Sequence, residues 1–114
     1  MRSLTLAVLL VATAACRGRG ALVTIRNESP DTLRSLTLSG RGFAEAVGTV
    51  APGALRAVRV QPHGESGIGV AFTADDRRIS VPEQAYFEGA GGYVVGVTVD
   101  SSLGVDVQVT LEQY

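Results

Sequence analysis

The chain has 114 residues, 46% of them hydrophobic, and a formal net charge of −1 at pH 7. This length predicts one domain with a single small core. All ten basic residues are arginines, and they are interspersed among eleven carboxylates rather than clustered. The composition therefore argues against a nucleic-acid-binding protein.

Residues 1–15 have the organisation of an export signal peptide. Arg2 supplies the positive charge, an apolar stretch covers residues 4–12, and small residues at 13–15 provide a cleavage site. The apolar stretch has about nine residues, whereas a membrane-spanning helix needs roughly twenty. We therefore predict a cleaved signal peptide rather than a permanent transmembrane helix.

Cys16, the only cysteine, directly follows these small residues and has no partner for an internal disulfide. The segment TAAC resembles the bacterial lipobox, in which the cysteine becomes the first mature residue and carries acyl chains. This resemblance implies lipid attachment at Cys16, a short tether over residues 16–20, and the lipid bilayer as a partner. Two or more acyl chains anchor a protein stably.

The residues around Cys16 indicate where in the cell the mature protein is located. By resemblance to lipoproteins, Arg17 after the cysteine favours the outer membrane, on its inner leaflet facing the periplasm. Thr13 departs from the lipobox, which usually has Leu, Val or Ile at that position. Ordinary signal-peptidase cleavage, which would release a soluble periplasmic protein, therefore stays open as an alternative.

Beyond the tether, short runs of alternating apolar and polar residues follow one another, separated by turn-forming residues. The runs lie at residues 23–25, 36–38, 47–50, 58–60, 68–74, 77–81, 93–99 and 103–111. The last two flank Asp100-Ser101-Ser102 and predict an antiparallel hairpin.

Seven or eight short strands without helical periodicity predict an all-β fold over residues 21–114. We expect a small antiparallel β-sandwich, either immunoglobulin-like or a similar Greek key. The Cys–Trp–Cys core of true immunoglobulin domains is absent, since the chain has no tryptophan and one cysteine.

His63 is the only histidine and lies in the segment PHGESGIG, close to Ser66. A hydrolase using this pair is a weak hypothesis, because the segment is no nucleophile elbow and no third orienting group is identifiable. We expect a polar turn and no enzyme.

One histidine and one cysteine supply no usual zinc site, so no metal or cofactor is predicted. Asn27-Glu28-Ser29 matches the glycosylation pattern, which we interpret as coincidence in an exported bacterial protein.

The segment YFEGAGGY, residues 86–93, combines aromatic residues, a carboxylate and three glycines. Aromatic residues are enriched at recognition surfaces, so Tyr86, Phe87, Glu88 and Tyr93 form a candidate partner-binding loop. In the alternative interpretation, which we favour, Tyr86 or Phe87 packs under the end of the sandwich. The glycines would then permit a tight or bulged entry into the last hairpin.

The segments APG (residues 51–53), PHGESG (62–67) and YFEGAGGY resemble a group of small uncharacterised proteobacterial lipoproteins, over residues 22–111. The resemblance implies an envelope location and no mechanism. We expect a membrane-anchored, non-enzymatic envelope lipoprotein that contacts an envelope protein or the cell wall. The alternative is a soluble periplasmic binding or chaperone-like accessory protein that pairs a client with an exposed strand edge.

Overall fold

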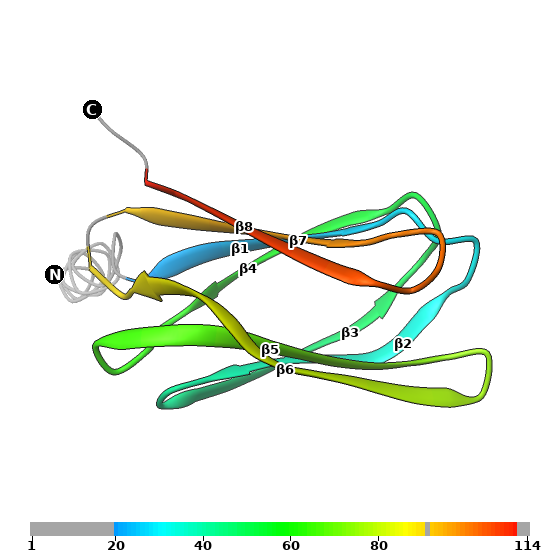
Figure 1. Cartoon of the computed structure of the whole chain (residues 1–114), viewed down its shortest axis with the longest axis horizontal. Helices are drawn as coiled ribbons and strands as arrows, with labels where there is room; N and C mark the ends of the chain where they lie inside the picture. The colour runs from blue at the N-terminus through cyan, green and yellow to red at the C-terminus, as the bar shows by residue number, and fades with distance from the viewer. Residues whose placement is uncertain (1–19, 91, 112–114) are drawn as a thin grey trace, which may run out of the picture.

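The computed structural model describes residues 20–90 and 92–111, and every regular element in them is a β-strand. Two four-stranded sheets pack face to face (Figure 1), so the prediction of an all-β sandwich is confirmed. The eight strands are β1 (Ala21–Asn27), β2 (Leu33–Gly40), β3 (Phe43–Val50), β4 (Leu55–Val60), β5 (Glu65–Ala74), β6 (Arg77–Glu88), β7 (Tyr93–Val99) and β8 (Val105–Leu111).

The strand order is β4-β1-β7-β8 in one sheet and β3-β2-β5-β6 in the other. β2–β3, β5–β6 and β7–β8 are hairpins within a sheet, whereas β4 returns from the second sheet to pair antiparallel with β1. An immunoglobulin constant domain instead places its first and second strands in the same sheet. The structure is therefore a β-sandwich whose strand order differs from that of an immunoglobulin constant domain.

One strand pair departs from the antiparallel expectation. β1 and β7 run parallel, with Leu22 opposite Val94 and Asn27 opposite Val99, whereas the other strand pairs are antiparallel. A parallel pair needs a long crossover connection, and here the chain between β1 and β7 builds β4 and the whole second sheet. In the order β4-β1-β7-β8, this parallel pair forms the centre of its sheet.

The core lies between the sheets and follows the predicted alternation. Every second residue of β1 and β7 points inward, where these side chains meet the apolar residues of β2 and β5. The fully buried members include Val23, Ile25, Val95, Val97, Leu36, Leu38, Ile68 and Phe72.

The predicted C-terminal hairpin is confirmed, with Val99 opposite Val105. β8 begins at Val105 rather than at residue 103, because the turn is longer than expected. The Asp100 carboxylate accepts hydrogen bonds from the backbone N–H of Ser102 (2.8 Å) and Gly104 (2.9 Å), and Leu103 has a φ of +69°. Such side-chain capping is typical of aspartate in turns.

Strands β1 to β6 all extend beyond the alternating runs of the sequence, and the extensions of β3 and β6 contribute residues to the end of the sandwich at which β1 begins. β3 begins at Phe43 rather than at residue 47, and β6 continues to Glu88 rather than ending at residue 81. β6 passes through Pro82, which an edge strand tolerates because one side of its backbone is unpaired. The prediction of a loop at Tyr86, Phe87 and Glu88 is therefore wrong, since these residues belong to a strand.

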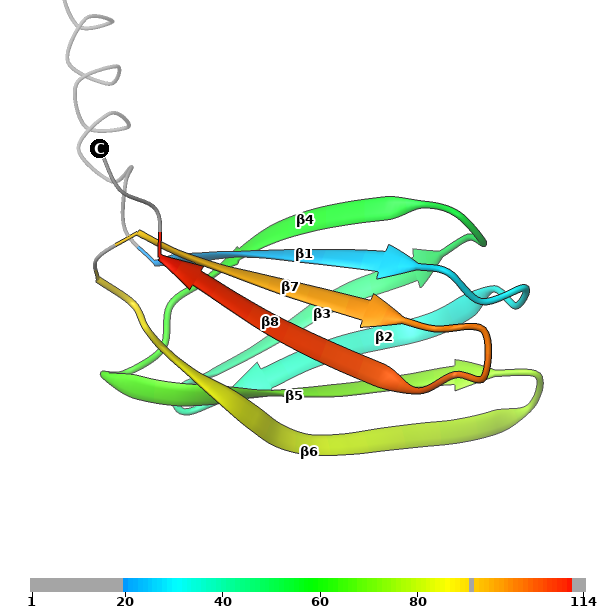
Figure 2. The same cartoon turned by 45° about the horizontal axis from the view of Figure 1, so that its top comes forward.

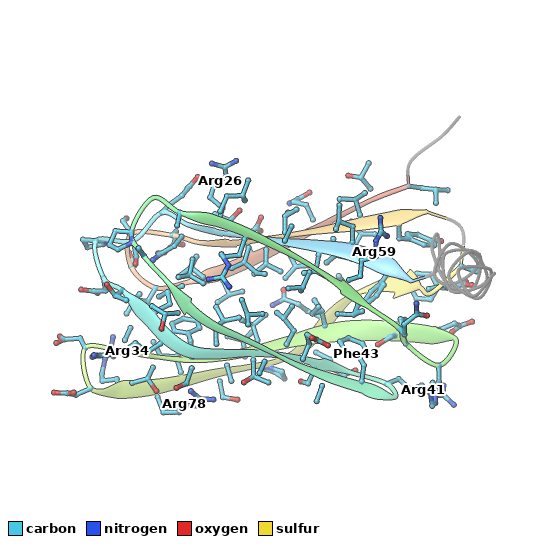
Figure 3. The ribbon with its side chains drawn as sticks, turned by 180° about the vertical axis from the view of Figure 1, so that it is seen from behind. Arg26, Arg34, Arg41, Phe43, Arg59 and Arg78 are labelled. Carbon is cyan, nitrogen blue, oxygen red and sulfur yellow. The ribbon has the colours of Figure 1, made fainter. Side chains whose placement is uncertain are left out.

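The chain connections gather at the two ends of the sandwich. The end at which β1 begins is here called the tether pole, and it also has the β2–β3 turn, the β4–β5 connection, the end of β6, the start of β7 and the end of β8 (Figure 2). By their positions in these strands and turns, Gly20, Arg41 and Leu111 lie at this pole. The other end, the distal pole, carries the β1–β2, β3–β4, β5–β6 and β7–β8 connections. Figure 3 shows Arg41 at the tether pole and Arg34 and Arg78 at the distal pole.

Candidate functional site

The tether pole is built from segments far apart in the sequence that are joined by backbone hydrogen bonds. The N–H of Gly20 donates to the carbonyl of Gly89 (2.9 Å), and the N–H of His63 donates to the carbonyl of Arg41 (2.9 Å). Gly20 has a φ of +89°, and a Cβ there would lie 2.5 Å from the Val60 carbonyl oxygen. Only glycine fits this entry into β1 without displacing its neighbour.

Ser66 holds this pole together from inside. It is buried, its hydroxyl accepts a hydrogen bond from the N–H of Arg41 (2.9 Å), and it donates to the carbonyl of Gly67 (2.7 Å). His63 is exposed, and within the described residues no hydrogen bond joins it to Ser66. Both hydrogen bonds of the serine hydroxyl are made with backbone groups, and this geometry does not support the hydrolase hypothesis.

Tyr86 lies on the outer face of β6, with 48% of its surface exposed. Its hydroxyl donates a 2.6 Å hydrogen bond to Oε2 of Glu88, two residues further along the same strand. This hydrogen bond is the main reason why the pKa of Tyr86 rises to about 12, with smaller contributions from desolvation and from the charge of Glu65. The phenol therefore stays neutral and serves as a hydrogen-bond donor.

A bulge in β6 sets this orientation. The register changes from Ser66 opposite Phe87 to Ile68 opposite Gln84, so β6 contains an extra residue, and Ala85 has a φ of +68°. The bulge fits because the facing position on β5 is Gly67, where a Cβ would lie 3.1 Å from the Gln84 carbonyl oxygen. Bulges commonly re-aim the side chains that follow them, and here Tyr86 faces solvent while Phe87 faces the core.

Phe87 closes the core at the tether pole. It is fully buried and packs edge-to-face against Phe43, with ring centroids 6.3 Å apart. It cannot reach a partner without unfolding, so its place in the predicted recognition segment is that of a core residue. Tyr93 begins β7 and is half-buried against the core, and Glu88 is also half-buried, which leaves Tyr86 as the one exposed residue among the four candidates.

A shallow depression of about 250 Å³ adjoins Glu88 at this pole. Its walls come from the β4–β5 and β6–β7 connections, and the lining residues are Gln61, Pro62, Gly64, Glu88, Gly89 and Ala90. Glu88 is the one charged side chain among them. The depression therefore offers a carboxylate and backbone groups rather than an apolar pocket.

Leu111 also belongs to the tether pole, although the sequence identified it only as the last apolar residue of the alternating run 103–111. It is 46% exposed and lies opposite Tyr93 at the end of the β7–β8 ladder. Among the described residues, the exposed large hydrophobic side chains are Tyr86, Leu111 and Leu55, and Leu55 lies at the distal end of β4. The strand pairing brings Tyr86 and Leu111 to one end, which alternation alone could not predict.

Other sequence predictions have a definite structural position or lie beyond the described residues. Cys16 and the signal segment lie outside residues 20–90 and 92–111. Asn27 is fully buried, which makes its glycosylation motif inaccessible in the folded domain. Within the described part of the chain, there is no group of three or more side chains suited to a metal ion. No helix there is long and apolar enough to cross a membrane.

Comparison with known proteins gives a fold and no function. No family model matches the chain, and no curated protein matches it. A solved structure, described as the NMR structure of the protein from Eubacterium rectale, is similar with a TM-score of 0.52 and 16% identity. The similarity covers 86% of this chain and 92% of that chain. It supports the β-sandwich architecture alone.

Proposed function

We propose that the protein is a non-enzymatic envelope lipoprotein, held to a membrane through acylated Cys16 and acting by contact through its tether pole. The observation that carries the proposal is the position of Cys16 relative to the fold. Only residues 17–19 separate it from Gly20, and the buried core begins at Ala21. The eight strands all follow Cys16, so removing residues 1–15 would take nothing from the sandwich.

The non-enzymatic part of the proposal has support from the tether pole. The Ser66 hydroxyl is engaged with backbone groups, and the exposed Tyr86 is hydrogen-bonded to the half-buried Glu88. A neutral tyrosine beside a carboxylate offers donor, acceptor and apolar area, which suits contact with another surface. Arg17, by resemblance to lipoproteins, favours an anchor in the inner leaflet of the outer membrane, with the domain facing the periplasm.

The decisive measurement is the intact mass of the full-length protein purified from bacterial membranes, beside a Cys16→Ser variant. We expect a species that begins at Cys16 and carries acyl mass, and we expect that species to be lost in the variant. An unacylated mature protein in the soluble periplasmic fraction would overturn the proposal.

A soluble accessory protein is the second candidate, and the position of β8 favours it. β8 is an edge strand, and its inward-facing Val105, Val107 and Val109 are only half-buried. An extended client segment could add to such an edge through backbone hydrogen bonds. This candidate requires cleavage without acylation, so the mass measurement separates the two.

A further inference from the structure

We propose that the partner of the tether pole is the headgroup layer of the membrane itself, with Tyr86 and Leu111 lying at the lipid interface. The inference rests on the proposed function, because it needs Cys16 to be acylated. Beyond that function, we infer that the tether pole contacts lipid rather than protein. The domain then has one orientation, with the distal pole facing away from the membrane.

The length of the tether limits where the domain can lie. An extended chain spans at most about 3.6 Å per residue, so the Cα atoms of Cys16 and Gly20 lie no more than about 14 Å apart. Gly20 is itself part of the fold, since it is buried and its N–H donates to Gly89. An acylated Cys16 at the membrane surface therefore holds the β6–β7 connection close to the headgroups.

The side chains brought there suit an interface between water and lipid. Tyr86 and Leu111 are 48% and 46% exposed and come from different sheets, so both sheets present apolar area at this end. Tyrosine combines an apolar ring with a polar tip and is enriched where lipid meets water. An exposed leucine next to a permanent anchor would gain from burying its surface in the headgroup region.

The charges at this pole have both signs. Arg41 lies there with Glu65 and Glu88, which face each other across β5 and β6. In the sequence, Arg17 and Arg19 lie between Cys16 and the fold. A zwitterionic headgroup such as phosphatidylethanolamine offers a phosphate to the guanidinium groups and an ammonium to the carboxylates. A purely anionic surface would repel Glu65 and Glu88.

The chain contains no tryptophan, so one substitution introduces an unambiguous fluorescent reporter. Tyr86→Trp and Leu111→Trp place it at the tether pole on separate sheets. Leu55→Trp is the matched control, because Leu55 is equally exposed (53%) but lies at the distal end of β4. Each acylated full-length variant would be reconstituted into phosphatidylethanolamine-rich vesicles containing brominated acyl chains, which quench tryptophan on contact.

We expect Tyr86→Trp and Leu111→Trp to lose most of their emission and to shift to shorter wavelength, while Leu55→Trp stays unchanged. If vesicle-bound, acylated protein shows no quenching at either tether-pole position, or equal quenching at all three, the inference is wrong and the lipoprotein proposal stands. Shielding of Tyr86→Trp only when a membrane protein is added would assign the pole to a protein partner instead. Absence of acyl mass at Cys16 would overturn the lipoprotein proposal and the inference together.

Discussion

Tyr86 and Phe87 are neighbours in the chain but lie on opposite faces of β6. Tyr86 is 48% exposed and hydrogen-bonded to Glu88, whereas Phe87 is fully buried and packs against Phe43. The bulge at Ala85 determines which of the two faces the core. One aromatic dipeptide therefore supplies both a core residue and a surface residue at the tether pole.

Phe87→Ala should reduce the free energy of unfolding by about 3–5 kcal/mol, because it removes a buried aromatic ring and leaves a cavity. Tyr86→Ala should change it by less than about 0.5 kcal/mol, as is usual for exposed positions. Urea unfolding of both variants beside the unsubstituted domain measures the difference. Equal losses would mean that the bulge does not separate the two side chains as described.

Tyr86 should ionise near pH 12 rather than near its ordinary value of 10.0, because Glu88 holds the phenol proton. The folded-state pKa is raised above the unfolded value, so this interaction stabilises the fold below about pH 10. The contribution is lost as the pH rises from about 10 to 12.

Tyrosinate absorbance measured against pH tests this, with Tyr86→Phe identifying the residue and Tyr93→Phe as the control. Glu88→Gln should lower the pKa of Tyr86 toward 10, since it removes the carboxylate charge. A Tyr86 that titrates alike with and without the Glu88 carboxylate would contradict the hydrogen bond.

Asn27 should be a structural residue that joins the sheets at the distal pole. Its side-chain amide donates to the carbonyl oxygens of Asp31 (2.8 Å) and Val50 (3.0 Å), and its Oδ1 accepts from the N–H and hydroxyl of Ser29. Asn27→Ala leaves several of these groups without a partner. A buried unpaired polar group costs roughly 1–3 kcal/mol, so we expect a loss of about 2–4 kcal/mol.

Thermal or urea unfolding measures this loss, and Ser29→Ala is the control that keeps the bond to Val50. Asn27→Ala should be clearly more destabilising than Ser29→Ala. A cost below about 0.5 kcal/mol, the range of surface substitutions, would show that the network contributes little.

Gly20→Ala tests how firmly the start of β1 is attached at the tether pole. Gly53 has a similar φ of +79°, and a Cβ there would meet no atom within 4 Å, so Gly53→Ala isolates the backbone cost, about 1–2 kcal/mol. Gly20→Ala must in addition displace the Val60 carbonyl, and overpacking costs about 1–3 kcal/mol more. Hydrogen exchange of the Gly89 region and unfolding of both variants measure the effect. Equal costs would mean that the entry into β1 adapts freely.

Local sequence patterns predicted the strands whose side chains alternate cleanly. β1, β7 and the β7–β8 hairpin could be identified because a half-buried strand places every second residue in the core. β3 and β6 were underestimated, since Ala44, Glu45, Pro82 and Glu83 break the alternation on edge strands exposed to solvent. Their extension depends on pairing with β2 and β5, which is not a local property.

The candidate site was only partly predictable for the same reason. The segment 86–93 was recognised by its composition, but the bulge that separates Tyr86 from Phe87 depends on Gly67 in another strand. Arg41 has no distinguishing sequence pattern, and the alternation marks Leu111 only as the end of the last strand. They join the tether pole only because the β2–β3 turn and the end of β8 lie beside the start of β1.

The sequence by itself determined the strand-rich composition, the inward face of each central strand and the short distance between Cys16 and the fold. These properties depend on residues close together in the chain. The tertiary structure alone decided the order of the strands, the parallel pairing of β1 with β7 and the location of Tyr86 and Leu111 at the same pole. Period-two alternation specifies which face of a strand is buried but carries no information about which strand lies beside it.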